Sequence, residues 1–208
     1  MIYSRGWGAL SSCKYEILTD RDKKILELVE QLKVVDVFTV DNILFKNTKC
    51  NRVCQRRLTN LAEFNRIKRW RPNQISSYIY YLGRKPGNID HSLLISHFVA
   101  YINILGGEVV KLKREWLIHE GIRIDLFIGY RLNDKNYIAI VEAENTKNFD
   151  KKYEKLEEYY LSNSYKELFP IMPKVICITD KPFKPGVLDV VTIDTKFNNI
   201  NVLLENQQ

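Results

Sequence analysis

The chain has 208 residues, 45% of them hydrophobic and 27% charged, which is ordinary for a globular protein with one large domain or two small ones. Its 32 Lys and Arg residues outnumber its 25 Asp and Glu residues, so the formal net charge is +7. No apolar run approaches the roughly 20 residues that a bilayer span requires, and no signal peptide is evident, so we expect a cytoplasmic protein without a membrane partner. Four scattered cysteines do not suggest a disulfide framework.

The positive charge is concentrated in the first part of the chain. Residues 1–88 carry 17 basic and 8 acidic side chains, a formal +9, whereas residues 89–208 carry 15 basic and 17 acidic side chains, a formal −2. Nine Lys and Arg residues lie between Lys46 and Arg71, against one acid, Glu63. Such a basic segment predicts a polyanionic partner. The opposite signs of the two parts predict two units with different roles.

Three short helices are predicted after a polar leader. The run Thr19-Asp20-Arg21-Asp22 is typical of a helix start, and apolar residues follow at helical spacing as far as Leu32. Thr39 is placed to cap a second helix, which Asn47 ends. Thr48 is placed to cap a third helix, predicted over Lys49–Asn65.

A β-hairpin is predicted next, from strand-favouring residues at Ile67–Arg71 and Ser77–Leu82 around a turn at 72–74. Three helices and a hairpin are the components of a winged helix-turn-helix domain. The Pro- and Gly-containing stretch Gly83–Asn88 is typical of a linker, and the sign of the charge changes there. We therefore assign residues 1–18 to a leader, 19–88 to a winged helix-turn-helix domain, 89–196 to a second domain and 197–208 to a C-terminal tail.

The third predicted helix has an apolar stripe and a basic stripe. Projection at 100° per residue places an apolar stripe on one side, formed by Cys50, Cys54, Leu58 and Leu61, and a basic stripe on the other, formed by Lys49, Arg52 and Arg56. Arginines projecting in this way can contact guanine edges or phosphates, so we predict binding to double-stranded DNA. The alternatives are a solvated helix face and a protein-docking module. The candidate DNA-binding residues on the helix and hairpin are Lys49, Arg52, Arg56, Lys68, Arg69 and Arg71.

The second half is predicted to be αβββαβ with one further strand, which gives an α+β fold class for the whole chain. Apolar residues at helical spacing predict helices, and strand-favouring runs predict strands. The two helices are predicted over Ile89–Leu105 and Asn148–Ser162. The strands are predicted over Val109–Glu115, Arg123–Leu132, Lys135–Glu144, Val175–Thr179 and Val190–Asp194.

Three acids lie on the predicted central hairpin of this half. Strand alternation places Glu142 and Glu144 on one face, and a turn at 133–134 places Asp125 opposite Glu142. Like charges that face each other on paired strands are destabilising without a compensating cation. We therefore predict that Asp125, Glu142 and Glu144 bind Mg²⁺ or Mn²⁺ if the site is catalytic. The alternative is that these acids lie on the open, solvated face of an edge hairpin.

The residues Ile124-Asp125 and Glu142-Ala143-Glu144, in this order of elements, resemble the PD-(D/E)xK nuclease fold shared by restriction endonucleases and resolvases. The resemblance implies that Asp125 and Glu142 are metal ligands and that the third motif position activates water. Members normally have Lys at that position, where this chain has Glu144, although a minority of active restriction enzymes also have Glu-x-Glu. Lys147 is a candidate to supply the missing cation.

The full order, from about Thr19 to Thr179, is also similar to the replication-relaxation family of plasmids, phages and integrative elements. The matching motifs are Asp125, Val141-Glu142-Ala143-Glu144 and the Lys- and Tyr-rich run 151–159. This resemblance implies a role in replication or conjugative transfer of a mobile element. Replication or relaxosome proteins and a second copy of the chain are then candidate partners.

Three functions remain open on the sequence alone. The first is a DNA-binding, metal-dependent endonuclease or nickase with Asp125, Glu142, Glu144 and Lys147 as catalytic residues. The second is a non-catalytic accessory protein in which a degenerate nuclease fold binds DNA or a protein partner. The third is a transcriptional regulator that uses its second half for dimerisation or effector sensing. Nucleotide hydrolysis is disfavoured, because the sequence contains no Gly-rich phosphate loop.

Overall fold

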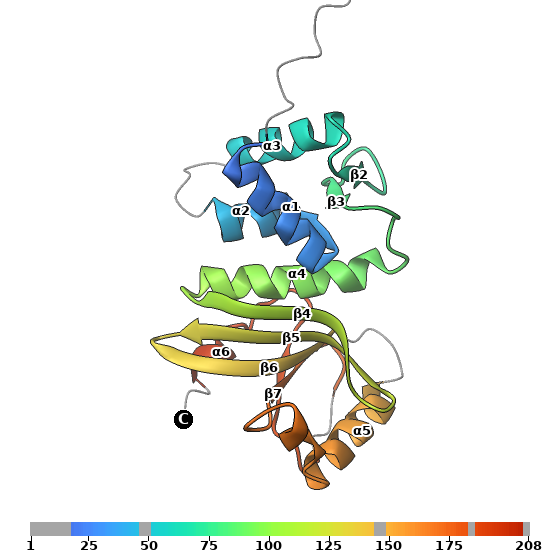
Figure 1. Cartoon of the computed structure of the whole chain (residues 1–208), viewed down its shortest axis with the longest axis vertical. Coiled ribbons are helices and arrows are strands. Elements are labelled where there is room, and N and C mark those ends of the chain that lie inside the picture. Colours follow the sequence, from blue (N-terminus) through green and yellow to red (C-terminus); the bar gives the residue numbers. More distant parts are fainter. Residues whose placement is uncertain (1–17, 46–50, 144–148, 183–185, 206–208) are drawn as a thin grey trace, which may run out of the picture.

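A computed structural model describes residues 18–45, 51–143, 149–182 and 186–205 of the chain (Figure 1). These residues form a mixed α+β fold with six α-helices, a three-stranded sheet and a five-stranded sheet. The α+β fold class predicted from the sequence is therefore confirmed. Within the described ranges, every helix is too short or too polar to span a bilayer.

Helix α1 (Asp20–Leu32) begins where the sequence predicts. The Thr19 hydroxyl accepts a hydrogen bond from the Asp22 backbone N–H at 3.2 Å, and the Asp22 carboxylate accepts one from the Thr19 N–H at 3.0 Å. This reciprocal capping box satisfies two N–H groups that have no partner within the helix. The apolar stripe that follows is buried and comprises Ile25, Leu28, Val29 and Leu32.

Helix α2 (Val37–Leu44) directly follows a short strand, β1 (Val34–Asp36). The N-cap residue of α2 differs from the predicted one. Asp36, not Thr39, is the N-cap, since its carboxylate accepts a hydrogen bond from the Thr39 N–H at 2.8 Å. The Thr39 hydroxyl donates to the same carboxylate oxygen and lies inside the first turn. The predicted helix end at Asn47 and the predicted cap at Thr48 lie outside the described residues.

Helix α3 (Arg52–Glu63) is followed by an antiparallel hairpin of β2 (Lys68–Trp70) and β3 (Ile79–Tyr81), as predicted, although both strands are shorter than expected. Strand β1 adds to the other edge of β3, which gives the order β1-β3-β2. The sequence did not predict β1, because three residues are too few to show an alternating pattern.

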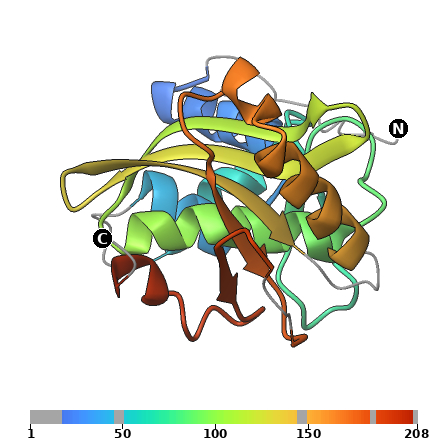
Figure 2. The ribbon, with the colours of Figure 1, turned by 90° about the horizontal axis from the view of Figure 1, so that it is seen from below.

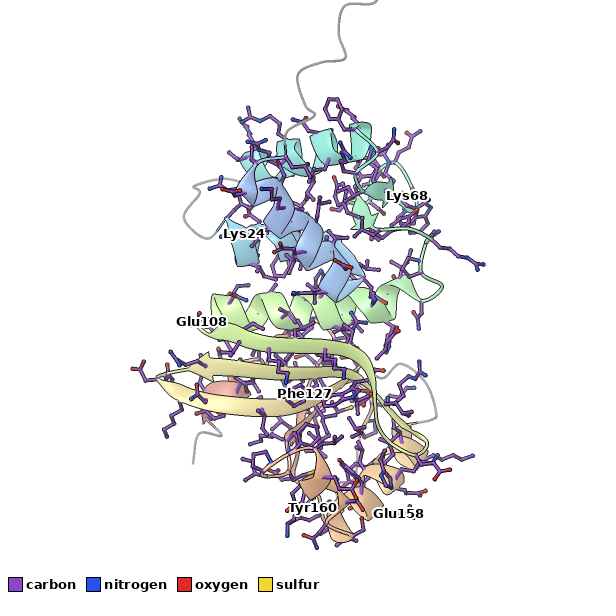
Figure 3. The ribbon with its side chains drawn as sticks, in the orientation of Figure 1. Lys24, Lys68, Glu108, Phe127, Glu158 and Tyr160 are labelled. Atoms are coloured by element: carbon purple, nitrogen blue, oxygen red, sulfur yellow. The ribbon has the colours of Figure 1, made fainter. Side chains whose placement is uncertain are left out.

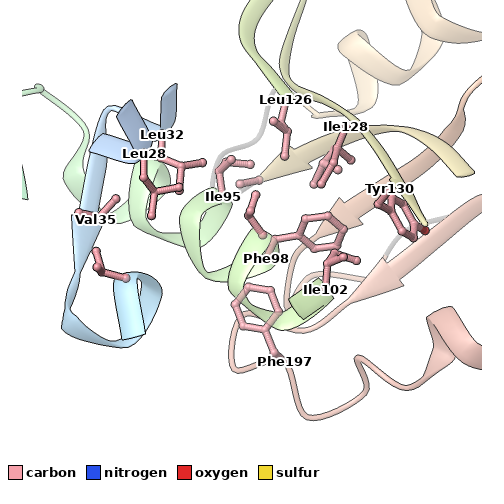
Figure 4. Close-up of a cluster of buried hydrophobic side chains, with 14 of the residues drawn as sticks. Leu28, Leu32, Val35, Ile95, Phe98, Ile102, Leu126, Ile128, Tyr130 and Phe197 are labelled. Atoms are coloured by element: carbon pink, nitrogen blue, oxygen red, sulfur yellow. The ribbon is translucent and has the colours of Figure 1, made fainter. Parts of the chain in front are cut away.

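Helix α4 (Ile89–Ile104) lies between the two sheets and is apolar on both sides (Figure 1). One continuous cluster of buried side chains crosses it, and Figure 4 shows Leu28, Leu32 and Val35 on one side of α4 and Leu126 and Ile128 on the other. The Ser96 hydroxyl adds a buried hydrogen bond from α4 to the Val34 carbonyl. The N-terminal elements and the five-stranded sheet therefore share one core through α4.

The five-stranded sheet has the order β4-β5-β6-β7-β8 and consists of an antiparallel meander extended by two parallel strands. Helix α4 packs on one face, and helix α5 (Phe149–Leu161) packs on the other (Figure 2). After the sheet, the buried residues Phe197, Ile200 and Leu203 attach the segment containing α6 (Val202–Glu205) to the α4 side. The strands are β4 (Glu108–His119), β5 (Ile122–Leu132), β6 (Lys135–Ala143), β7 (Lys174–Ile178) and β8 (Val190–Ile193).

The turn between β5 and β6 sets the register of the hairpin that carries the predicted acids. Asn133 and Asp134 have φ values of 50° and 61°, the left-handed conformations that a tight two-residue hairpin turn requires. Leu132 therefore pairs with Lys135, and the same register continues to Leu126 opposite Val141. One further step along each strand places Asp125 opposite Glu142, as the sequence predicts.

Candidate functional site

The site is built at the start of β5 and the end of β6, inside the sheet rather than at its edge. The Asp125 side chain is 19% exposed and the Glu142 side chain is 2% exposed. Both strands have a neighbour on each side, since β4 borders β5 and β7 borders β6. The alternative interpretation of Asp125 and Glu142 as solvated residues of an edge hairpin is therefore wrong.

Lys152 of α5 supplies a positive charge to this acid pair. Its ammonium nitrogen lies 3.4 Å from Asp125 Oδ1 and donates a hydrogen bond to Glu142 Oε2 as well. Two carboxylates and one ammonium group thus form a contiguous cluster, the Asp125–Glu142–Lys152 cluster. The negative charges raise the pKa of Lys152, because their attraction outweighs the effect of burial. Lys152 therefore remains an ammonium ion at neutral pH.

Asp125 is held by partners from three elements. Its Oδ2 accepts a hydrogen bond from the Ala143 N–H at 3.0 Å and lies 3.5 Å from His91 Nε2 in the first turn of α4. Burial alone would raise the pKa of Asp125, but His91 and Lys152 lower it well below its usual value. The hydrogen bond to Asp125 in turn raises the pKa of His91. Asp125 is thus a fixed carboxylate anion at neutral pH.

The pKa of Glu142 is shifted in the opposite direction from that of Asp125. Burial and the nearby charge of Asp125 raise its pKa well above the usual value, and Lys152 only partly offsets this effect. Its Oε1 is buried and accepts no hydrogen bond from the described residues, but the protonated carboxyl group shares a hydrogen bond with Asp125, which also raises the pKa of Glu142. A buried acceptor without a partner costs about 1–3 kcal/mol. Four other buried side-chain atoms of the described residues, among them the hydroxyl oxygens of Tyr137 and Tyr159, lack a partner as well, so this acceptor does not by itself mark a site.

The described residues bring together two of the three predicted metal ligands. Glu144 and Lys147 lie outside the described residues, and no group of three or more His, Cys, Asp and Glu side chains within the described ranges is arranged to hold a metal ion. Two carboxylates are nevertheless a suitable set for Mg²⁺, which keeps several waters and commonly binds through one or two carboxylates and substrate phosphates.

Sequence reasoning missed Lys152 and His91, although both leave a signal in the sequence. Lys152 precedes the buried residues Leu156 and Tyr159 by four and seven positions, so it lies on the inner stripe of α5. His91 precedes Ile95 and Phe98 by the same intervals in α4. Each is a polar residue at the first position of a buried stripe.

The predicted basic face of α3 is present over the described residues. Arg52 and Arg56 are exposed, whereas Cys54, Leu58 and Leu61 of the opposite stripe are buried. Lys49 lies outside the described residues. Arg57, next to this face, instead points to α1, where its guanidinium lies 3.5 Å from the Asp22 carboxylate. Two adjacent arginines of α3 therefore have different environments.

The β2–β3 hairpin carries the other candidate DNA-binding residues. Lys68 and Arg69 are exposed. The guanidinium groups of Arg69 and Arg71 lie 4.7 and 4.6 Å from the centre of the Tyr78 ring, and Arg71 donates a hydrogen bond to the Gln74 carbonyl. These contacts hold the arginines in place without neutralising them, so their charge remains available to an anion.

The different environments of Arg56 and Arg57 lead to a testable contrast. If α3 binds DNA as the sequence predicts, Arg56→Ala should weaken that binding and reduce the salt slope of log K by about 1, because an exposed cation is lost. Arg57→Ala is expected to lower the free energy of unfolding by up to about 1 kcal/mol through loss of the ion pair with Asp22. Fluorescence anisotropy in a salt series and thermal unfolding measure the two effects. Equal effects of both variants on the salt slope would contradict the assignment.

A second prediction concerns the pH dependence of stability. The folded-state pKa of Glu142 lies above its unfolded value, so its contribution to stability is fully present below the unfolded pKa and is lost as pH rises through the folded pKa. Glu142→Gln cannot ionise, so its stability relative to wild type should be greater at pH 8 than at pH 5. Thermal unfolding at both pH values measures this. Glu120→Gln, at an exposed position, is the control, and a gain that is larger at pH 5 would refute the assignment.

Comparison of the chain with protein-family models, curated proteins and solved structures finds no match. The functional assignment therefore rests on the chain's own residues and their geometry.

Proposed function

We propose that the protein is a DNA-binding protein of a mobile genetic element, with a winged helix-turn-helix in its first half and a metal-dependent, PD-(D/E)xK-like endonuclease or nickase in its second half. One observation carries this proposal. The ammonium group of Lys152 contacts both Asp125 and Glu142 at the junction of β5, β6 and α5. Two carboxylates and a lysine are the functional groups of the PD-(D/E)xK motif, which the sequence resembles at Asp125 and Glu142.

In this arrangement, Lys152 takes the role of the lysine that the motif normally has at its third position. The third motif position is Glu144, which departs from the usual Lys. Lys152 reaches the acid pair from α5 instead, so the required cation comes from the helix that covers the sheet. We assign this role to Lys152 in place of Lys147, the candidate chosen from the sequence.

Each residue of the cluster then has a distinct role. Asp125 and Glu142 would hold Mg²⁺ or Mn²⁺, which supplies an activated water and neutralises charge on the phosphate. His91 and the Ala143 N–H orient the Asp125 carboxylate. Lys152, as an ammonium ion, donates hydrogen bonds and stabilises negative charge; its raised pKa makes it a poor general base at neutral pH.

A plasmid nicking assay tests this function. Supercoiled plasmid is incubated with the full chain and Mg²⁺ or Mn²⁺, and relaxed and linear products are measured against an EDTA control. Wild type should nick the plasmid in a metal-dependent reaction, Glu142→Ala should lose this activity, and Glu120→Ala at an exposed turn should retain it. Intact plasmid with every metal would refute hydrolysis by this site.

A second candidate function, a non-catalytic accessory or regulatory DNA-binding protein, is favoured by a specific feature of the same cluster. Lys152 already bridges the two carboxylates and compensates their charge without a metal. A degenerate nuclease fold retained for binding can have this arrangement. DNA binding without nicking in the assay above would support this function.

A further inference from the structure

A small group of buried apolar side chains connects the β2–β3 hairpin to α4, the helix whose His91 contacts the Asp125–Glu142–Lys152 cluster. Val34, Ile79 and Ile89 are buried together, and Trp70 of β2 and Leu93 of α4 pack against them. This places the hairpin directly on the first two turns of α4. His91, in the first of these turns, reaches Asp125. The hairpin and the catalytic site are therefore in contact through a single short helical segment.

Arg114 of β4 forms a second connection. This largely buried side chain donates one hydrogen bond to the Leu32 carbonyl at the end of α1, at 2.7 Å, and one to the Asp125 carbonyl, at 3.1 Å. The N-terminal helices are thus tied to the backbone of the catalytic strand. Two independent sets of contacts therefore fix the position of the N-terminal elements relative to the Asp125–Glu142–Lys152 cluster.

Positive charge continues from the hairpin toward the site. Arg84 and Lys85 are exposed in the segment between β3 and α4, and the Lys85 ammonium lies 3.4 Å from the centre of the Trp70 ring. Lys68 is on the same face of the hairpin as Trp70, since alternate residues of a strand share a face. Arg69 and Arg71 stack on Tyr78 on the opposite face. Basic residues therefore lie on both faces of the hairpin and at Arg84 and Lys85, just after β3.

The separation between hairpin and site is short on the scale of DNA. Trp70 packs against the cluster containing Ile89, His91 is two residues further along the helix, and its ring lies 3.5 Å from Asp125. Along these contacts, the distance from Trp70 to Asp125 is roughly 15–20 Å, about half a turn of B-DNA. In Figure 1, β2, β3 and the start of α4 lie on one side of the molecule, and Figure 3 shows Lys68 on that side and Glu108 on the other.

We propose that one continuous DNA duplex, bound by α3 and the β2–β3 hairpin, passes over Arg84 and Lys85 to the Asp125–Glu142–Lys152 cluster of the same molecule. This inference rests on the proposed DNA binding and extends it, because it assigns the path of the duplex and the basic surface that guides it. The site then acts on DNA within about one helical turn of the hairpin contact. Charge complementarity and the rigid connection select duplex DNA as the occupant of this surface.

Tethered DNA scission tests the path without requiring nuclease activity. Single cysteines at Gln74, Lys151 and Glu108 are each coupled to an iron–EDTA reagent in the full chain, with Cys13 and Cys50 changed to Ser and the buried Cys54 and Cys177 retained. All three positions are exposed. Gln74 reports DNA at the hairpin, Lys151 reports DNA at the catalytic cluster, and Glu108 is the control at the other end of the sheet. The probe is a 40-base-pair duplex, assayed in EDTA without Mg²⁺.

We expect scission from Gln74 and Lys151 at yields within about threefold of each other, and background scission from Glu108. Scission from Gln74 with background scission from Lys151 would overturn the path and leave the proposed DNA binding intact. Failure of all three proteins to bind the duplex would refute DNA binding itself. Scission from Lys151, in a protein that nicks no plasmid in Mg²⁺, would support the path and refute only the catalytic part of the proposed function.

Charge reversal along the connecting segment provides a second test. The double variant Arg84→Glu/Lys85→Glu should reduce scission from Lys151 at least fivefold, with a smaller loss from Gln74, because the guiding charges lie between the two positions. The matched control is Lys111→Glu/Lys135→Glu, the same change of charge at exposed positions on other strands. An equal reduction at Lys151 by both double variants would overturn the role of Arg84 and Lys85.

Discussion

Lys152→Met is expected to reduce metal-dependent nicking by a factor on the order of 10²–10⁴, the usual loss when a side chain that assists the chemical step is removed. Lys152 donates to both Asp125 and Glu142, and methionine preserves most of its volume without the charge. The nicking rate under metal saturation measures the effect. Lys155→Met is the matched control, because Lys155 lies on α5, is exposed and contacts the Gly121 carbonyl rather than the acid pair.

The same variant has a second readout that separates a catalytic role from a structural one. Without Lys152, the Asp125–Glu142 pair retains His91 as a cationic partner but loses the ammonium group that contacts both carboxylates, so the variant should unfold at a lower temperature than wild type in EDTA. Mg²⁺ should restore more stability to the variant than to wild type, since the metal replaces the lost positive charge. A variant that retains wild-type nicking, or that gains no more stability from Mg²⁺ than wild type does, contradicts the assignment.

Arg114→Met is expected to lower the free energy of unfolding by about 2–3 kcal/mol. Two hydrogen bonds from a charged donor to buried carbonyls are lost, and the reduced cost of burying a guanidinium group offsets only part of this loss. A change of this size lowers the midpoint of thermal unfolding by roughly 5–10 °C in a chain of this length. Lys111→Met, on the same strand and exposed, is the control.

Arg114→Met should also weaken the connection between α1 and β5. In the tethered scission experiment, this variant is expected to broaden the distribution of cuts made from Lys151, because β5 is held less firmly to α1. A wild-type unfolding midpoint in the Arg114→Met protein would show that these two hydrogen bonds contribute little to the fold.

The sequence predicted most of the elements, because most of them are long and periodic. The strand containing Asp125, its partner and the turn between them were placed in the correct register, since a two-residue turn with Asn133 and Asp134 leaves one way to pair the strands. The errors occur where the sequence pattern covers only a few residues. Strand β1 has three residues, and Asp36 competes with Thr39 for the role of cap.

The site was predicted only in part, for a different physical reason. Asp125 and Glu142 belong to one hairpin, so local pairing brings them together. Lys152 and His91 reach the same point from α5 and α4, and such contacts depend on how helices pack on a sheet. A sequence pattern places a residue on a helix stripe, but it does not say which residue of the sheet that stripe meets.

Helix α4 belongs to two packing surfaces at once, and this limits how the protein can be divided. A fragment ending at Asn88 would lose the side chains that cover Leu28, Leu32 and Val35, while the remaining fragment would expose the outer side of Ile95 and its neighbours to water. Neither piece retains a closed interior. The first 88 residues therefore do not form an independent cassette, and if the proposed DNA binding holds, a new specificity has to be introduced by changing the surface of α3 within the intact chain.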